Sequence, residues 1–142
     1  MYRDLAPQDA TILVVEDSSP IRSMVCAMLT QTGYRCLEAS DGAEALEVLK
    51  DGAGDVQLVL TDVVMPNMNG AELAEHLSKT RPNLRILFMS GYSDDSLVNS
   101  ISRAPLFLPK PFTAMALMEK VRQALESDSV PVPRRSRGAG PA

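Results

Sequence analysis

The 142-residue chain has the length of one domain, and its hydrophobic fraction of 45% and charged fraction of 23% are ordinary for a globular protein. Its net charge of −4 argues against non-specific nucleic-acid binding by the whole chain. No apolar run approaches the ~20 residues that span a bilayer, and the first residues lack the apolar core of a secretion signal. Cys26 and Cys36 have no metal-type spacing. We therefore expect a cytoplasmic protein with reduced thiols that contacts neither a membrane nor nucleic acid directly.

Strand-like and helix-like segments alternate from the start of the chain. Ile12–Val15 is a short apolar run typical of a buried strand, and the helix after it begins near Ser18 or Ser19, with Pro20 in its first turn. Gly33 ends that helix. The residues predicted to face inward are Ile21, Val25, Met28 and Leu29.

A second strand, a second helix and a third strand follow. Tyr34–Glu38 is the second strand, and Ser40 or Asp41 caps a helix that stops near residues 51–52. Val56–Thr61 is the most continuously apolar segment, which favours a central strand.

The second half repeats the alternation after a loop rich in Pro, Asn and Gly. A third helix is predicted from about Ala71 to Lys79, a fourth strand over Leu84–Met89, and a weakly patterned fourth helix over 93–101. Leu106–Leu108 is the fifth strand. Thr113 caps the last helix, whose inward stripe is Leu117, Val121 and Leu125.

Repeated βα units predict an α/β domain with a parallel sheet. We expect an N-terminal extension over residues 1–10, one domain over 11–126 and a disordered tail over 127–142, where Ser, Pro, Gly and Arg dominate. Pro109 cannot donate a ladder hydrogen bond, so the fifth strand has to be an edge.

Acidic residues end two of the predicted strands. Glu16 and Asp17 follow the first strand, and Asp62 follows the third. The carboxyl ends of parallel strands meet at one rim, so these three carboxylates should converge there. Because like charges at close range repel, the arrangement favours a hard cation with oxygen ligands, and Mg²⁺ fits best. Ser90 and Lys110, which end the fourth and fifth strands, could donate to phosphoryl oxygens at the same rim.

The sequence resembles the receiver domains of two-component response regulators over roughly residues 11–125. The segments that carry the resemblance are Val14-Val15-Glu16-Asp17, Leu60-Thr61-Asp62-Val63-Val64-Met65-Pro66, Met89-Ser90-Gly91 and Lys110-Pro111-Phe112, and they are most similar to receivers of hybrid histidine kinases. The resemblance implies a flavodoxin-like doubly wound (βα)5 fold with strand order 2-1-3-4-5. It also implies a phosphorylation-controlled switch, with a histidine kinase or histidine phosphotransfer protein as donor, that is a monomer or a phosphorylation-dependent dimer.

The resemblance further implies a role for each site residue. Asp62 would be the phosphoacceptor. Asp17, Asp62 and the backbone carbonyl of Val64 would bind Mg²⁺, and Glu16 would act through water. Lys110 would pair with Asp62 and then with the phosphoryl group. Ser90 would move to a phosphoryl oxygen on activation, and Phe107 would rotate inward behind it. The Lys110-Pro111 bond resembles the family's cis peptide.

Two other functions stay open at this point. One is a Mg²⁺-dependent phosphohydrolase with an aspartyl-phosphate intermediate; its usual second acid, two residues after the nucleophile, is here Val64. The other is a scaffold that never receives phosphate, which the complete set of site residues argues against. The stretch between Ser90 and Lys110 looks a residue or two shorter than in the family. Val64 and Tyr92 should flank the path of an attacking water and slow the loss of phosphate.

Overall fold

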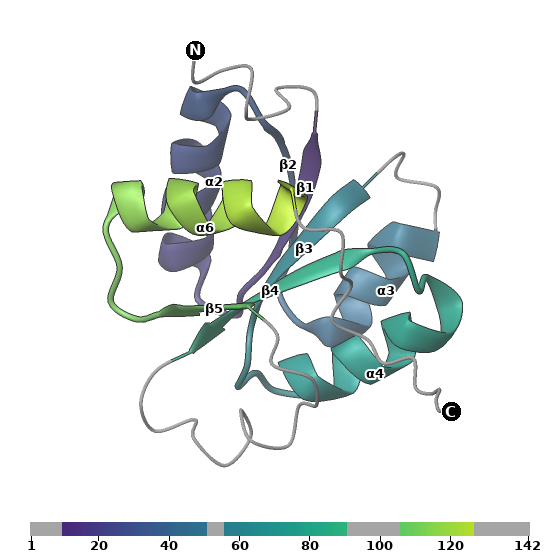
Figure 1. Ribbon diagram of the computed structural model, residues 1–142. Coiled ribbons are helices and arrows are strands. Elements are labelled where there is room, and N and C mark those ends of the chain that lie inside the picture. The colour runs from purple at the N-terminus through teal and green to yellow at the C-terminus, as the bar shows by residue number, and fades with distance from the viewer. Residues whose placement is uncertain (1–9, 51–55, 91–105, 127–142) are drawn as a thin grey trace.

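The computed structural model describes residues 10–50, 56–90 and 106–126. Within them, five parallel strands form one sheet in the order β2-β1-β3-β4-β5, with helices on both faces (Figure 1). The strands are β1 (Thr11–Val15), β2 (Arg35–Ala39), β3 (Val56–Asp62), β4 (Arg85–Ser90) and β5 (Leu106–Pro109). The helices are α2 (Ser19–Thr32), α3 (Gly42–Lys50), α4 (Gly70–Thr80) and α6 (Ala114–Glu126). The doubly wound order predicted for the chain is thus confirmed.

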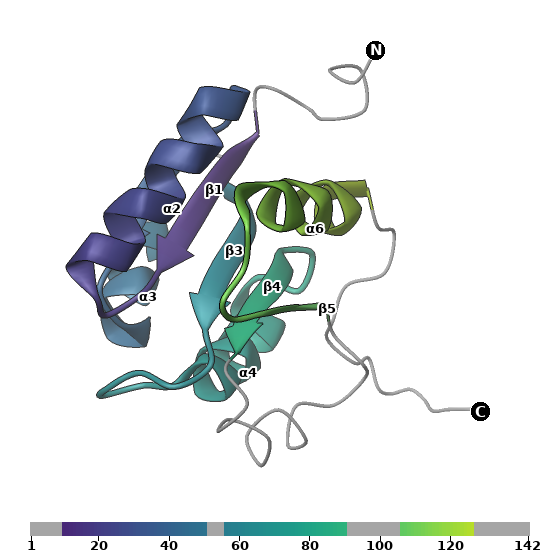
Figure 2. The ribbon, with the colours of Figure 1, turned by 90° about the vertical axis from the view of Figure 1, so that its left-hand side faces the viewer.

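Two apolar layers hold the sheet between its helices. Side chains alternate along β1: Ile12 and Val14 pack in the layer under α2 and α6, whereas Leu13 and Val15 pack in the layer under α3 and α4. Figures 1 and 2 show this division of the helices between the two faces. Because both faces are covered, every residue of β1 is buried, as expected of a central parallel strand.

The predicted helix ends have their physical basis in capping contacts. Ser18 caps α2 by accepting from the amide of Ile21, and Gly33 ends the helix in the left-handed conformation, at φ 111°. Asp41 accepts from the Glu44 amide at the start of α3. Thr113 accepts from the Ala116 amide at the start of α6.

Some element details differ from the sequence prediction. The second strand runs one residue later than predicted, and Tyr34 is buried just before it. On α2 the buried side chains are Val25, Cys26 and Leu29, while Ile21 and Met28 are only partly buried. On α6 Ala124 is buried, and Leu125 lies at the margin of the core. Helix α4 starts at Gly70, because Asn69 and Glu72 form a reciprocal capping box that the apolar pattern did not reveal.

The predicted fourth helix, the C-terminal tail and the N-terminal extension up to residue 9 lie outside the described residues. In the described part no helix is long and apolar enough to cross a membrane. Strand β5 is at the edge of the sheet, where Pro109 pairs in register with Ser90 of β4. This position resolves the conflict between a proline and a ladder.

Candidate metal and phosphoryl site

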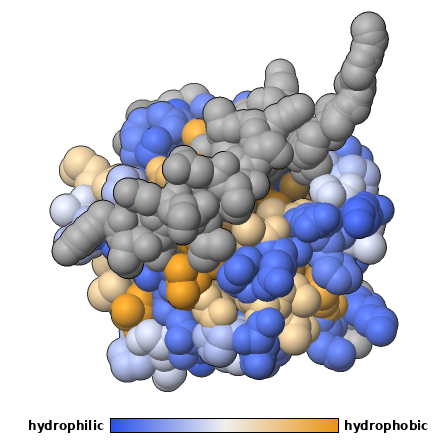
Figure 3. Space-filling view, turned by 90° about the horizontal axis from the view of Figure 1, so that it is seen from below, coloured by the Kyte–Doolittle hydropathy of each residue, from blue (hydrophilic) through white to orange (hydrophobic). Residues whose placement is uncertain are grey.

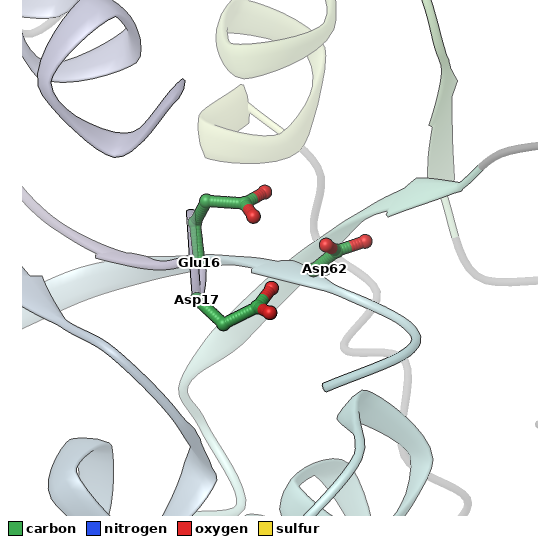
Figure 4. Close-up of side chains that lie close together, drawn as sticks. All are labelled: Glu16, Asp17 and Asp62. Carbon is green, nitrogen blue, oxygen red and sulfur yellow. The ribbon is translucent and has the colours of Figure 1, made fainter. Parts of the chain in front are cut away.

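The sheet brings three carboxylates together at the carboxyl ends of its central strands. Val15 of β1 lies opposite Thr61 of β3, so the residues that follow them, Glu16 and Asp62, are neighbours across the rim. One oxygen from each of Glu16, Asp17 and Asp62 lies within 4.8 Å of the others. Figure 4 shows the carboxylates turned toward one another, as the sequence predicts.

Glu16 is nearly inaccessible, at 2% exposure. Its Oε2 accepts from the Ser18 amide at 3.0 Å, but its Oε1 is buried and accepts no hydrogen bond from the described residues. The Lys110 Nζ lies 3.7 Å from that oxygen. A buried carboxylate oxygen without a donor is costly, and a hard cation with its water shell fits this donor set.

Asp62 sits beside Glu16 and is tied to Lys110. Both of its carboxylate oxygens accept from the Lys110 Nζ at 3.0 Å, and Oδ1 also accepts from the Val63 amide at 3.0 Å. The Lys110 amide donates to the Ser90 carbonyl at 2.9 Å, which fixes the turn after β5 against the end of β4. The predicted Lys110–Asp62 pair is therefore present in the structure.

The electrostatics of the crevice favour an additional positive charge. Burial, reinforced by the negative charge of Asp62, raises the pKa of Glu16 to about 7, although the Ser18 amide and Lys110 oppose the shift. Burial likewise raises the pKa of Asp62, against the hydrogen bond and charge of Lys110. A single ammonium thus does not compensate the clustered carboxylates.

The other predicted site residues lie around this centre. Ser90 ends β4 and is partly exposed, and the Lys110-Pro111 peptide is cis. Phe107 is partly buried, with its ring tilted against Phe88 at a centroid separation of 5.5 Å. The side chain of Val64 is 49% exposed. Tyr92 and the shortened stretch after Ser90 lie outside the described residues.

Two contacts at the site were not predicted from the sequence. Arg22 of α2 donates to the Glu16 carbonyl, and Asn67 of the loop after β3 donates to Asp41 at 2.8 Å. A basic residue close to a helix N-terminus, where the helix dipole disfavours it, was the available signal for Arg22. Asn67 has a left-handed φ of 68°, and asparagine in a Pro- and Gly-containing loop was the corresponding signal there.

The crevice has the parts that phosphoryl transfer to a carboxylate requires. Asp62 offers a nucleophilic oxygen, Lys110 a cation for phosphoryl oxygens, and the acids a metal site. Such transfer depends on position and charge neutralisation more than on covalent help.

Figure 3 views the molecule from the side of the strand carboxyl ends, where hydrophilic and apolar residues are both exposed.

Comparison with known proteins agrees with this geometry. The family described as the response regulator receiver domain matches residues 12–122. The chain belongs to the response regulator receiver domain family.

Relatives of the receiver occur in proteins of very different length. This chain is 40% identical to the sensor kinase CckA of Brucella abortus over 82% of its own length, but the match covers only 13% of the kinase. It is 35% identical to the response regulator receiver protein CpdR of the same organism, covering 80% of the chain and 95% of CpdR. The solved receiver domain of the hybrid histidine kinase CckA is 35% identical with a TM-score of 0.70, covering 82% of this chain and all of that one.

These similarities confirm the receiver family, its fold and a phosphoacceptor role in two-component signalling. Receiver domains are phosphorylation-controlled switches, they interact with histidine kinases or phosphotransfer proteins, and they generally bind Mg²⁺ at an acidic pocket. This chain has an acidic cluster at residues 16, 17 and 62, whose carboxylate oxygens could hold a metal ion.

Proposed function

We propose that this receiver accepts a phosphoryl group on Asp62 from a phosphohistidine donor and then changes its interaction surface. The observation that carries the proposal is the contact of Lys110 Nζ with both oxygens of the buried Asp62, while the same Nζ lies 3.7 Å from Glu16 Oε1, which accepts no hydrogen bond from the described residues. In the transfer, an Asp62 oxygen forms the new bond to phosphorus while the bond between phosphorus and the donor imidazole nitrogen breaks.

Each site residue has a distinct part in the proposal. Lys110 neutralises a phosphoryl oxygen as the Asp62 carboxylate becomes an acyl phosphate. Asp17, Asp62 and the carbonyl of Val64 would hold Mg²⁺, with Glu16 acting through water. Such an ion would supply positive charge that stabilises the transferring phosphoryl group. Ser90 would donate to a phosphoryl oxygen after transfer, and Phe107 would then leave its place against Phe88 and turn inward.

The proposal extends to the partners and the context of the receiver. The donor would be a histidine kinase or a histidine phosphotransfer protein, and the receiver would be a monomer or a phosphorylation-dependent dimer. The domain would comprise residues 11–126 between an extension and a disordered tail. The two free cysteines fit a reducing cytoplasm.

Phosphoryl uptake is tested with acetyl phosphate and Mg²⁺. The intact mass of the wild-type chain should rise by one phosphoryl group, and Asp62→Asn should abolish the rise because an amide oxygen is a far weaker nucleophile. Glu47→Gln is the control, since Glu47 is an exposed acid on α3 that lies outside the crevice. Equal labelling of Asp62→Asn and wild type contradicts the assignment of the phosphoacceptor.

Once formed, the phosphoryl group should persist rather than clear rapidly. Val64 offers no hydrogen bond to orient an attacking water, and Tyr92 is bulky enough to narrow its approach. Replacing Val64 with Asn and Tyr92 with Glu should speed the loss of phosphate more than a few-fold, equivalent to roughly 1 kcal/mol or more of barrier. Decay is followed by mass spectrometry after the donor is removed.

Turnover of small phosphate esters separates a switch from a phosphohydrolase. No acid stands at position 64 to handle the proton of a leaving group, so steady turnover of small phosphate esters should be absent. Sustained release of inorganic phosphate from such esters by wild-type protein would favour the enzyme.

In the decay experiment, a double mutant that loses phosphate no faster than wild type would show that residues 64 and 92 do not control water access.

A further inference from the structure

The structure assigns a positioning role to Arg22: its side chain holds the Glu16–Asp17 peptide in place and thereby sets the Mg²⁺ affinity of the acidic crevice. This inference rests on the proposed function. It concerns a residue that acts through the backbone of the acidic pair rather than by touching the ion or the phosphoryl group.

The guanidinium joins the acidic turn to the edge of the sheet. Arg22 Nη1 donates to the Glu16 carbonyl at 2.7 Å, and Nε donates to Glu38 Oε1 at 3.0 Å. Glu38 lies in β2, where it pairs in register with Val14 of β1. The Arg22 side chain is 18% exposed and that of Glu38 is 47% exposed, so the contact with the Glu16 carbonyl is the better shielded of the two.

The turn that carries the acids depends on these backbone contacts. The Glu16 amide donates to the Ala39 carbonyl at 3.1 Å, which fixes one side of the residue, and Arg22 fixes its carbonyl on the other side. Asp17 follows directly and is exposed. No side chain in the described ranges hydrogen-bonds its carboxylate. The backbone position from which the Asp17 side chain extends therefore depends on the peptide that Arg22 holds.

The helix end is an unfavourable place for this cation. Arg22 lies near the N-terminus of α2, where the helix dipole favours negative charge, and the first turn of α2 contains no acidic residue. The Glu38 pair and the Glu16 carbonyl offset that cost locally. A methionine would retain the apolar stem of the side chain and remove the unfavourable charge.

Charge and position predict opposite effects on metal affinity. If Arg22 acted only as a nearby positive charge, its removal would relieve repulsion of the incoming cation, and Mg²⁺ would bind more tightly. If Arg22 orients the Glu16–Asp17 peptide, its removal loosens a ligand, and Mg²⁺ binds more weakly. The sign of the change thus distinguishes the two roles without reference to its size.

The test is a calorimetric Mg²⁺ titration of the full chain, with Arg22→Met, Arg22→Lys and Glu38→Gln. We expect Arg22→Met to weaken Mg²⁺ binding by about tenfold, the scale seen when groups that orient metal ligands are removed. Arg22→Lys should recover part of the loss, since an ammonium can reach one of the two acceptors. Glu38→Gln should weaken binding less than Arg22→Met does.

Arg122→Met is the matched control. Arg122 is 30% exposed on α6 and pairs with Glu119 and Glu126, so its removal makes the same change in net charge elsewhere on the fold. Its Mg²⁺ affinity should equal that of wild type. A second readout is the Mg²⁺ concentration that half-saturates acetyl-phosphate labelling, which should rise in Arg22→Met while the rate at saturating Mg²⁺ changes little.

Unchanged or tighter Mg²⁺ binding in Arg22→Met overturns the positioning role while leaving the proposed function intact. A wild-type chain that neither binds Mg²⁺ nor takes up phosphate overturns the proposed function, and this inference with it. If Arg22→Met does not fold, Arg22→Lys and Glu38→Gln decide the question: both must weaken Mg²⁺ binding, and wild-type affinity in either of them rejects the role.

Discussion

Glu16 is a buried carboxylate whose two oxygens have different surroundings. Its Oε2 is held by the Ser18 amide, while Oε1 has Lys110 at 3.7 Å and Asp62 close by. In the absence of a metal, burial therefore favours the protonated form, and its pKa rises to about 7. Protonation of a single residue thus links the charge state of the crevice to the stability of the domain.

Without divalent cations, the free energy of unfolding should fall as pH rises from about 5 to about 7. The folded chain binds the Glu16 proton more tightly than the unfolded chain, whose glutamate has a pKa near 4.5. Its contribution is therefore fully present below that unfolded value and is lost as pH passes through 7. The loss is on the order of 2 to 3 kcal/mol. Urea unfolding across this pH range measures it.

Glu16→Gln should flatten the pH dependence, although the raised pKa of Asp62 adds a slope of the same sign. Glu44→Gln is the control. Hydrogen bonds from Ser40 lower the pKa of Glu44, so its stabilising contribution is already complete above the unfolded value and constant in this window. The control should keep the wild-type slope. A Glu16→Gln slope equal to that of wild type would contradict the raised pKa.

At the scale of the elements, the start of α4 is joined to the end of β3 beside Asp62, the proposed phosphoacceptor. The Gly70 amide donates to the Val63 carbonyl at 2.7 Å, directly after Asp62. A Cβ at position 70 would lie 2.5 Å from the Asp62 carbonyl oxygen. The neighbouring Asn69 caps the helix but belongs to a contact with Glu72 rather than with Asp62. The stability of α4 and the placement of Asp62 can thus be tested separately.

Gly70→Ala should lower both stability and phosphoryl uptake. The clash is with backbone, so the end of β3 has to shift, at a cost of about 1 to 3 kcal/mol typical of overpacking. Asn69→Ala loses the cap at a cost of about 1 kcal/mol but leaves the Asp62 backbone in place. Denaturant unfolding and initial rates of acetyl-phosphate labelling are measured on both variants, at a temperature where both are folded. Equal labelling rates would mean that Gly70 serves the helix alone.

On the scale of the whole molecule, the convergence of three acids on one rim couples the fold to its cation. Mg²⁺ that binds only the folded chain stabilises it by mass action. The chain has a net charge of −4, so a cation also reduces general repulsion. A local effect of Asp17 is distinguished from this general effect by comparing acids inside and outside the crevice.

The melting temperature should rise with Mg²⁺, by the equivalent of about 2.7 kcal/mol at one hundred times the dissociation constant. Asp17→Asn should lose most of that rise. It should also melt higher than wild type without metal, because one of three repelling charges is gone. Glu47→Gln removes an exposed acid on α3 and should respond to Mg²⁺ as wild type does. A normal Mg²⁺ response in Asp17→Asn rules it out as a ligand.

The amino-acid sequence by itself determined the alternation of strands and helices and the meeting of Glu16, Asp17 and Asp62 at one rim. Apolar runs bury in a parallel sheet, and the carboxyl ends of such strands share an edge, so these features follow from local pattern. Resemblance to receivers added the strand order and the pairing of Lys110 with Asp62. The spacing of Asn69 and Glu72 is that of a capping box, but Asn69 lies in a Pro-, Asn- and Gly-rich loop and was not recognised as a cap.

Only the tertiary structure decided which contacts complete the site. Arg22 donates to the Glu16 carbonyl and Asn67 donates to Asp41, and each hydrogen bond joins two different segments of the fold. Among the described residues, Glu16 Oε1 accepts no hydrogen bond, which also depends on the packing around it. The distances between these residues depend on how the sheet twists and on which rotamers the packed layers allow. The hydrophobic periodicity of the sequence predicts neither of them. The burial of a side chain also depends on the strands on both sides of it. The raised pKa values of Glu16 and Asp62, which result from burial, could therefore be found only from the folded structure.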